Sequence, residues 1–193
     1  MRITVTVFAG GEGSRIGGNK PLRMLAGLTL LDRAAAQALQ WSNRFAVSVR
    51  SEAQLGGRGL VPIIDDPDVE GPLGGLISAL RFARAEQADA VLTIPADMPF
   101  LPPDLGERLK AELAGCEAAI ASSGGHLHPV CGLWRTSALD QIAGYLESGR
   151  RSLRGFAETI GFRVVEWPDR PIDPFFNINS AQDLADAERL LGG

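Results

Sequence analysis

Apolar and polar positions follow one another in blocks that predict strands and helices in turn. The segment ITVTVF at 3–8 is rich in β-branched residues and predicts a first strand, and apolar residues at helical spacing predict a helix over 28–41. The same two patterns recur as strands at 45–49, 61–64 and 90–94 and as a helix at 73–85. Uninterrupted apolar strands that alternate with helices are typical of a parallel sheet covered on both faces.

The second half of the chain is less regular. Its patterns predict helices at 104–113 and 137–146 and strands at 118–121, 129–134 and 163–167. The stretch WPDRPIDP at 167–174 is predicted to be a loop, because its three prolines fit neither a helix nor a central strand. Ser180 is predicted to cap a last helix that ends at Leu191. We therefore expect a three-layer α/β fold with a doubly wound, mostly parallel sheet, forming a single domain over 1–193 that binds ligands beyond the carboxyl ends of its strands.

Composition and charge exclude several classes of protein. The chain is 45% hydrophobic without an apolar stretch long enough to cross a bilayer, and its first apolar run leads into glycines rather than a cleavage site. The net charge is −4 and the basic residues are scattered, which argues against a nucleic-acid surface. Cys116 and Cys131 lie outside any CxxC pattern and indicate buried thiols in a reducing compartment. We expect a cytoplasmic protein that binds neither membranes nor nucleic acid.

The first loop, within FAGGEGSRIGGNKPL at 8–22, has the composition of a phosphate-binding loop. Its glycines allow the backbone to approach a ligand closely, and Arg15 and Lys20 can neutralise phosphate charge. No Ser or Thr follows Lys20, so the loop is not a P-loop, and Arg15 breaks the GxGxxG spacing of dinucleotide-binding loops. A surface turn is the alternative for the loop taken alone.

Asp97 is the second candidate, in the stretch VLTIPADMPFL. An aspartate directly after a buried strand is costly to desolvate unless a cation meets it, and Mg²⁺ with triphosphate oxygens would do so. We predict Asp97 as a metal ligand. The alternative is an aspartate that caps or shapes the turn.

Together these motifs resemble those of the molybdenum cofactor guanylyltransferases. The first loop is similar to the family signature LAGGxxxRMGGxDK, and EGPLGGL at 70–76 and PADMPFLPPDL at 95–105 are similar to the GPLAG and DxP segments. Three later stretches resemble the HP, LxxGxRR and VNTPEDL segments of the family: HPVCGLW at 128–134, YLESGRRSL at 145–153 and FFNINSAQDL at 175–184. The resemblance therefore covers nearly the whole chain.

The resemblance implies a glycosyltransferase-A-like nucleotidyltransferase fold and transfer of GMP from GTP to the terminal phosphate of molybdopterin, with Mg²⁺ as cofactor and pyrophosphate as the second product. It also implies a nucleotide site made of Phe8, Ala9, Gly10, Gly11, Lys20, Ser48, Asp65 and Asp97. Asp66 is the alternative to Asp65 as the aspartate that binds the guanosine. Asn179 would join Asp97 in the metal site, and other proteins of molybdenum cofactor maturation are possible partners.

Ser48 departs from the family pattern, which often has an asparagine at this position. Guanine presents N1–H and N2–H₂ as donors and O6 as an acceptor, and a serine can satisfy fewer of these than an amide. Two smaller departures, Ile16 and Asn19, remove no phosphate contact.

The site of the second substrate is predicted from four residues in the later motifs, namely His128, Arg150, Arg151 and Asn177. Paired arginines suit a pterin that carries a phosphate. The alternative for Arg150 and Arg151 is a solvated helix end, and for His128 it is a structural hydrogen bond at the start of a strand.

The predicted chemistry needs no general base, because a phosphate monoester is largely ionised at neutral pH with a second pKa near ~6. Arg15, Lys20 and Asp97 with its Mg²⁺ are the predicted catalytic groups, which neutralise charge while the substrates are held in line. The alternatives are a molybdopterin cytidylyltransferase, a sugar-phosphate nucleotidyltransferase or a catalytically silent nucleotide-binding regulator. The segment GPLGG favours guanine, and the presence of both Lys20 and Asp97 argues against a silent regulator.

Overall fold

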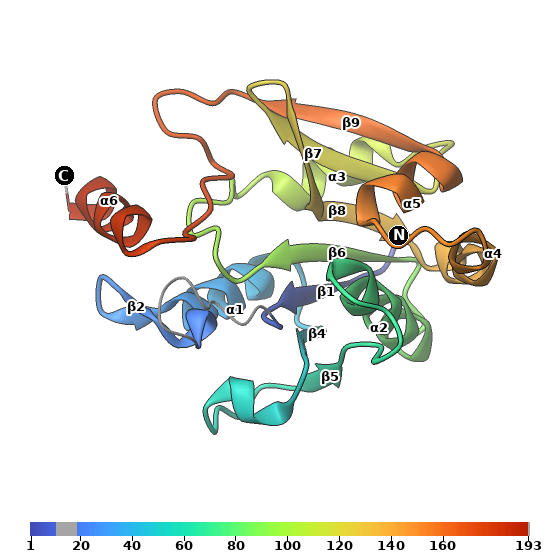
Figure 1. Ribbon diagram of the computed structural model, residues 1–193. Helices are drawn as coiled ribbons and strands as arrows, with labels where there is room; N and C mark the ends of the chain where they lie inside the picture. Colours follow the sequence, from blue (N-terminus) through green and yellow to red (C-terminus); the bar gives the residue numbers. More distant parts are fainter. Residues whose placement is uncertain (11–18, 193) are drawn as a thin grey trace.

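A seven-stranded sheet runs through the molecule in the computed structural model, which describes residues 1–10 and 19–192 (Figure 1). Its strands are β1 (Ile3–Phe8), β4 (Phe45–Val49), β5 (Pro62–Ile64), β6 (Ala90–Pro95), β7 (Ala118–Ser123), β8 (His126–Arg135) and β9 (Phe162–Trp167). The order across the sheet is β5-β4-β1-β6-β8-β7-β9. Within this sheet, β8 alone is antiparallel to its neighbours, so the predicted mostly parallel sheet is confirmed.

The helices lie on both faces of this sheet. They are α1 (Leu30–Trp41), α2 (Pro72–Ala85), α3 (Leu105–Glu112), α4 (Ile142–Glu147), α5 (Leu153–Ile160) and α6 (Ala181–Gly192). Short 3₁₀ helices cover η2 (Lys20–Leu22), η3 (Glu52–Leu55) and η4 (Thr136–Gln141), and the two-residue strands β2 (Met24–Leu25) and β3 (Leu28–Thr29) form a hairpin. No described helix has the length and apolar character needed to cross a membrane.

Most predicted elements agree with the observed ones to within one or two residues. The predicted helix over 28–41 was wrong at its start, because 28–29 pairs in the hairpin and Thr29 then caps α1 by accepting a hydrogen bond from the Asp32 amide at 3.1 Å. The predicted helix over 137–146 divides into η4 and α4, and α5 was not predicted. The predicted cap of α6 is confirmed by the Asp183 amide, which donates to Ser180 Oγ at 3.1 Å.

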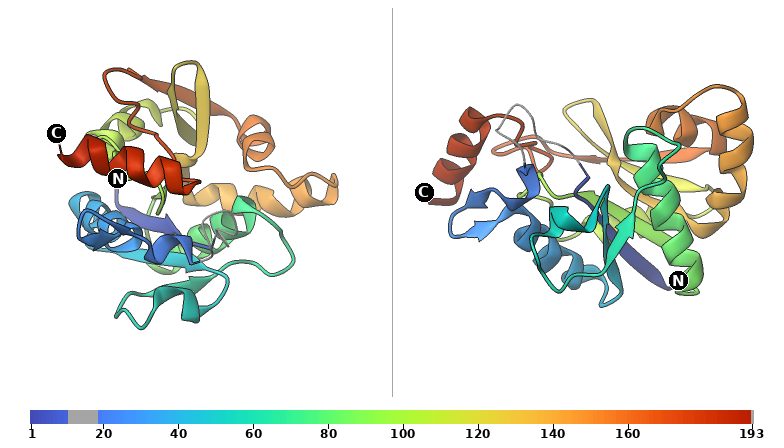
Figure 2. Two further views of the ribbon diagram at one scale, coloured as in Figure 1. Left: turned by 60° about the vertical axis from the view of Figure 1, so that its left-hand side comes forward. Right: turned by 60° about the horizontal axis from the view of Figure 1, so that its bottom comes forward.

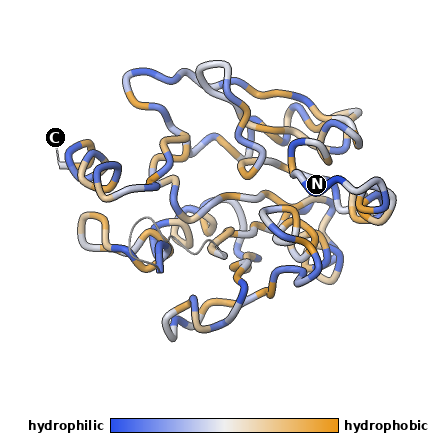
Figure 3. The backbone as a smooth tube through the Cα atoms, viewed as in Figure 1, coloured by the Kyte–Doolittle hydropathy of each residue, from blue (hydrophilic) through white to orange (hydrophobic). Residues whose placement is uncertain are grey.

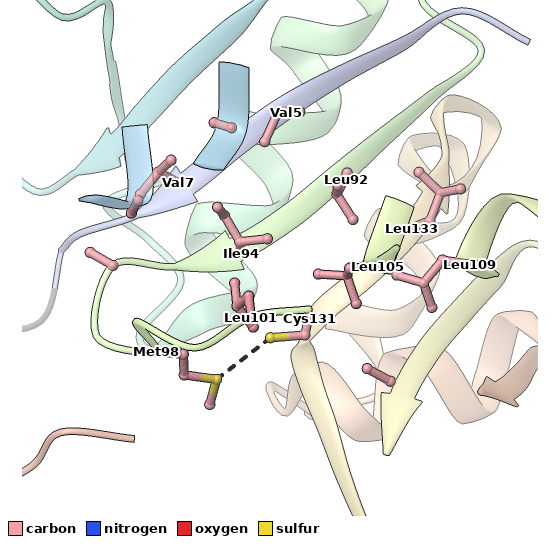
Figure 4. Packing of buried hydrophobic residues seen from close by; sticks show 14 of the residues in the cluster. Val5, Val7, Leu92, Ile94, Met98, Leu101, Leu105, Leu109, Cys131 and Leu133 are labelled. Atoms are coloured by element: carbon pink, nitrogen blue, oxygen red, sulfur yellow. Dashed lines mark hydrogen bonds between the residues drawn. The ribbon is translucent and has the colours of Figure 1, made fainter. Parts of the chain in front are cut away.

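Two apolar clusters fill the space between the sheet and its helices, so the predicted three-layer arrangement is confirmed. On one face, α1 and α3 pack on strand residues such as Val5, Val7 and Leu92 (Figure 4). On the other face, α2 and α5 pack on Val91 and Trp134. Strand residues are therefore buried on both sides, which explains the continuous apolar runs in the sequence (Figure 3).

Cysteine burial agrees with the prediction at one position and only partly at the other. Cys131 is fully buried beside Met98, with 3.6 Å between their sulfur atoms, whereas Cys116 is half-buried. Both thiols are free.

The carboxyl ends of the parallel strands meet at one edge of the sheet, as predicted. Three candidate residues follow directly, since Gly10 comes after β1, Asp65 after β5 and Asp97 after β6. A third apolar cluster, which includes Ile178, packs α6 against the β2–β3 hairpin beside this edge (Figure 2).

Candidate active site

A cleft of about 280 Å³ opens at the carboxyl edge of the sheet. Its lining residues come from five segments and from the start of α2: Phe8, Gly10, Ser48, Arg50, Asp65, Gly71, Pro72, Gly75, Pro95, Asp97 and Val130. A second hollow of about 500 Å³ shares Arg50, Asp65 and Gly71 with the cleft. Five of the predicted nucleotide-site residues thus line one cleft. A sixth, Ala9, lies between two of them and is 2% exposed, and its amide donates to the Ser48 carbonyl at 2.9 Å.

Lys20 lies within a group of side-chain oxygens near this cleft. Its ammonium forms an ion pair with Asp97 Oδ2 and donates to Asn179 Oδ1 at 2.8 Å and to Asn177 Oδ1 at 3.4 Å. The segment that carries both asparagines is fastened next to Asp97, because the Ile178 amide donates to the Asp97 carbonyl at 3.0 Å. Two segments far from Lys20 in the sequence, one with Asp97 and the other with Asn177 and Asn179, therefore contact its ammonium.

One carboxylate oxygen of Asp97 is available to bind a cation. Its Oδ1 is buried and has no hydrogen-bond partner within the described part of the chain, although Oδ2 is paired with Lys20. A buried carboxylate oxygen without a donor is costly unless a cation satisfies it. Among the described residues there is no group of three or more His, Cys, Asp or Glu side chains that could enclose a metal. The donors present therefore fit Mg²⁺, which binds through one or two carboxylates and completes its coordination with phosphates and water.

Ser48 and Asp65 form a tight pair on the α2 side of the cleft. The Ser48 hydroxyl donates a hydrogen bond to Asp65 Oδ1. Burial raises the pKa of the Asp65 carboxyl, while the bond from Ser48 and the positive charge of Arg50 act in the opposite direction. The glycines of the first loop and of GPLGG leave room for this pair, since a Cβ at Gly10 would lie 2.6 Å from Asp65 Oδ2 and one at Gly75 would lie 2.9 Å from Ser48 Oγ.

Asp66, the alternative to Asp65, points to a different partner. Its carboxylate forms an ion pair with Arg81 of α2 at 2.9 Å, and it lines the second hollow but not the cleft itself.

His128 belongs to a hydrogen-bonded chain at the same edge of the sheet. Its Nε2 lies 2.8 Å from Ser123 Oγ, and that hydroxyl donates to Asp173 Oδ1 at 2.8 Å. Because the single hydroxyl proton points to Asp173, the imidazole must donate through Nε2, which leaves Nδ1 as an acceptor in the neutral ring. The ring stacks on Phe175 with 4.6 Å between centroids, and burial lowers the pKa of His128.

Arg150 and Arg151 do not line the cleft. The Arg150 guanidinium lies 4.7 Å from the ring centroid of Tyr145, and Arg151 donates to the Leu146 carbonyl at 2.8 Å, so both contact the end of α4. Figures 1 and 2 show α4 and α5 at the opposite end of the molecule from α6. Their role in binding the pterin stays a prediction.

Gly11 and Arg15 lie outside the described residues. Three other residues at this edge were not singled out from the sequence: Arg50, Ser123 and Asp173. Arg50 follows a predicted strand closely and could have been found from that position, whereas Ser123 and Asp173 gain their significance only from contact with each other.

Comparison with known proteins shows the family of this chain. The family model described as a MobA-like NTP transferase domain matches residues 5–161. A molybdenum cofactor guanylyltransferase from Cereibacter sphaeroides is 40% identical over 194 residues, which cover 99% of this chain and 98% of the relative. Another from Rhodopseudomonas palustris is 39% identical, over 95% of this chain and 91% of the relative.

A solved structure extends the similarity to three dimensions. The crystal structure of molybdopterin-guanine dinucleotide biosynthesis protein A from Archaeoglobus fulgidus superimposes with a TM-score of 0.79 at 28% identity, over 98% of both chains. The predicted glycosyltransferase-A-like nucleotidyltransferase fold is thereby confirmed.

Proposed function

The chain belongs to the molybdenum cofactor guanylyltransferases, enzymes that transfer GMP in the synthesis of the guanine dinucleotide form of this cofactor, and from this premise we propose how its residues carry out the transfer. The donor is GTP and the acceptor is the terminal phosphate of molybdopterin. A phosphate oxygen of the acceptor forms a bond to the α-phosphorus of GTP, and the bond from that phosphorus to the bridging oxygen breaks. Pyrophosphate leaves with the electron pair of the broken bond.

The single observation that carries this proposal is the group formed by Lys20, Asp97, Asn177 and Asn179 beside the cleft. An ammonium beside a triphosphate offsets the negative charge that builds up on the α-phosphate and on departing pyrophosphate. Lys20 is the described residue suited to this task, and Arg15 is the second candidate. Because the acceptor phosphate is already ionised, the residues need only hold it in line and no base has to remove a proton.

Asp97 and Asn179 are the proposed ligands of Mg²⁺, and the unpartnered Oδ1 of Asp97 supports this role. When bound, Mg²⁺ would neutralise triphosphate charge and help to orient the phosphates. Asn177 lies near the same ammonium, so it can position Lys20 as well as contact the pterin for which it was predicted.

Asp65 is the proposed reader of the guanosine, at the end of the cleft bounded by α2. An ionised carboxylate accepts two parallel hydrogen bonds, and guanine offers two neighbouring donors in N1–H and N2–H₂. Cytosine and adenine present no such pair of donors on that edge, so a carboxylate there favours GTP.

His128 is the proposed contact to the second substrate. Its Nε2 donates to Ser123, which donates to Asp173, so Nδ1 remains as an acceptor. The ring stacks on Phe175, which fixes its orientation. A fixed acceptor beside an aromatic ring suits a pterin, which is planar and carries N–H donors.

The test is isothermal titration of the protein with GTP, CTP, ATP and UTP, each with Mg²⁺, repeated on Asp97→Ala. We expect selective binding of GTP that weakens in the variant. In parallel, formation of the dinucleotide from molybdopterin and GTP is followed by chromatography. Equal binding of CTP would contradict the base assignment, and unchanged binding by Asp97→Ala would contradict the metal role.

A further inference from the structure

Ser48 occupies a position from which it can act on Asp65 but hardly on a ligand. It lies near the end of β4 and lines the cleft, but it is only 1% exposed, so little of its side chain can meet a bound nucleotide. A serine hydroxyl has one proton, and here that proton is donated to Asp65 Oδ1. The only proton of the hydroxyl is therefore already in a hydrogen bond with the carboxylate and is not available to a ligand.

The backbone fixes the two residues relative to each other. Ser48 pairs with Phe8 of β1 and with Ile63 of β5 in the parallel sheet. The Asp65 amide donates to the Val49 carbonyl at 2.9 Å, directly beyond Ser48. The two side chains thus start from a rigid part of the sheet, and the hydrogen bond selects one rotamer of the aspartate.

Two glycines lie against the pair and leave the space that it needs. The positions that a Cβ would take at Gly10 and Gly75 lie 2.6 Å from Asp65 Oδ2 and 2.9 Å from Ser48 Oγ. These are the glycines of the first loop and of the GPLGG segment, so both motifs serve the same pair.

From this geometry we propose that Ser48 is a positioning residue, which orients the Asp65 carboxylate for the nucleotide and does not itself read the base. The inference rests on the proposed function of Asp65 as the group that binds the guanosine. It gives a role to the position at which this chain departs from the asparagine of its family.

The charge on Asp65 depends on the same hydrogen bond. Burial raises the pKa of Asp65, whereas the bond from Ser48 and the charge of Arg50 lower it. Of the other charged groups described nearby, Asp66 is paired with Arg81 of α2 and Asp97 with Lys20, and Glu70 lines the second hollow together with Asp65. Loss of the hydroxyl would therefore raise the pKa of Asp65 further and make its charge sensitive to mild acid.

The experiment measures the affinity for GTP with Mg²⁺ from pH 5.5 to pH 8 in wild type, Ser48→Ala and Ser48→Cys. Ser78→Ala is the matched control, because Ser78 is also a buried serine and its hydroxyl donates to the Ile64 carbonyl at 2.7 Å and not to the Asp65 carboxylate. Melting temperatures are recorded for every variant. Protonation of GTP itself is common to all proteins and cancels in the ratio of each variant to wild type.

We expect Ser48→Ala to lose at least about tenfold in affinity at neutral pH, as for a hydrogen bond to a charged group. The loss should grow as the pH falls, because Asp65 becomes protonated at a higher pH in the variant. Ser48→Cys, with its weak S–H donor, should lie between wild type and Ser48→Ala, and Ser78→Ala should bind GTP as wild type does.

A loss by the same factor at every pH would place the hydroxyl on the nucleotide and overturn the proposal. Wild-type affinity in Ser48→Ala, or an equal loss in Ser78→Ala, would also overturn it. These results are distinct from failure of the proposed function, which would be seen in wild type alone as a lack of preference for GTP.

Discussion

Lys20 and Asp97 form an ion pair at the carboxyl edge of the sheet, one from η2 and the other from the turn after β6. The same ammonium is bound by the side-chain oxygens of Asn179 and Asn177. Carboxylate and amide oxygens are also the ligands that hard divalent cations take. The ammonium and a metal ion would therefore meet at the Asp97 carboxylate and compete for Asn179 Oδ1 until phosphates draw the lysine away.

Lys20→Met is expected to slow GMP transfer and, at the same time, to tighten the binding of a divalent metal ion. The rate of GMP transfer should fall about 10²-fold, because a charge that stabilises the transition state is lost. Binding of Mn²⁺ without nucleotide, measured by electron paramagnetic resonance, should become tighter because the ammonium no longer occupies Asp97 and Asn179.

Lys110→Met is the control for this change, because Lys110 is exposed on α3 and is the only other lysine in the sequence. It should alter neither transfer nor Mn²⁺ binding. If Lys20→Met bound Mn²⁺ more weakly than wild type, competition between the two cations would be ruled out.

Gly10→Ala should weaken GTP binding by more than tenfold while the protein remains folded. Its Cβ would lie 2.6 Å from Asp65 Oδ2, so the carboxylate must turn away from the orientation that Ser48 sets. Gly144→Ala is the matched control, because a Cβ at this exposed helical position meets nothing within 4 Å. It should bind GTP normally and gain about 0.5–1 kcal/mol in stability from helix propensity. Titration calorimetry and urea denaturation check both, and normal affinity in Gly10→Ala would show that the carboxylate has room to move.

The sequence predicts the sheet well because its central strands are rich in apolar and β-branched residues. The strands at 3–8 and 45–49 have their predicted bounds, since such residues give a strong strand signal. By contrast, helix α5 was not predicted although Ser152 caps it. Its sequence, LRGFAETI, is short, and the two arginines that precede Ser152 hide the beginning of the helical pattern. The hairpin before α1 was missed because its strands have two residues each, and its turn has positive φ at Ala26 as well as at Gly27, although alanine gives no turn signal.

From the sequence, only those site residues that directly follow parallel strands could be predicted. Residues after β1, β5 and β6 must meet at one edge in a parallel sheet, so Gly10, Asp65 and Asp97 were accessible to sequence reasoning. The contacts from Ser48 to Asp65 and from Ser123 to Asp173 depend on side-chain rotamers. No spacing in the sequence encodes those.

His128 should make the stability of the protein depend on pH. Burial lowers its pKa in the folded state, so the unfolded chain takes up the proton first as the pH falls through about 6.5. The stability that the neutral ring contributes is therefore complete above that pH and is lost progressively below it. The difference in unfolding free energy between wild type and His128→Gln should shrink from pH 7.5 to pH 5.5, as measured by urea denaturation. A difference that stays constant over this range would show that the ring does not change its protonation on unfolding.

Thr93 and Thr6 are register partners on β6 and β1, and both are fully buried, yet they should respond differently to the same substitution. Thr93 Oγ1 accepts a hydrogen bond from Trp134 Nε1 at 3.1 Å and donates to the Gly132 carbonyl at 3.2 Å. Thr6 Oγ1 has no partner within the described residues. Thr93→Val leaves a buried indole N–H unpaired and removes one hydrogen bond from the Gly132 carbonyl, so it should cost about 1–3 kcal/mol.

Thr6→Val replaces an unsatisfied hydroxyl by a methyl group of similar size, so it should be neutral or stabilising. Urea denaturation of the two variants gives the comparison directly, because neither side chain lines the cleft and GTP affinity should be unchanged in both. Equal losses of stability would mean that the hydroxyl of Thr6 also has a partner in solution, such as a buried water. In that case both threonines would contribute hydrogen bonds to the centre of the sheet, and the contrast drawn from their contacts would be wrong.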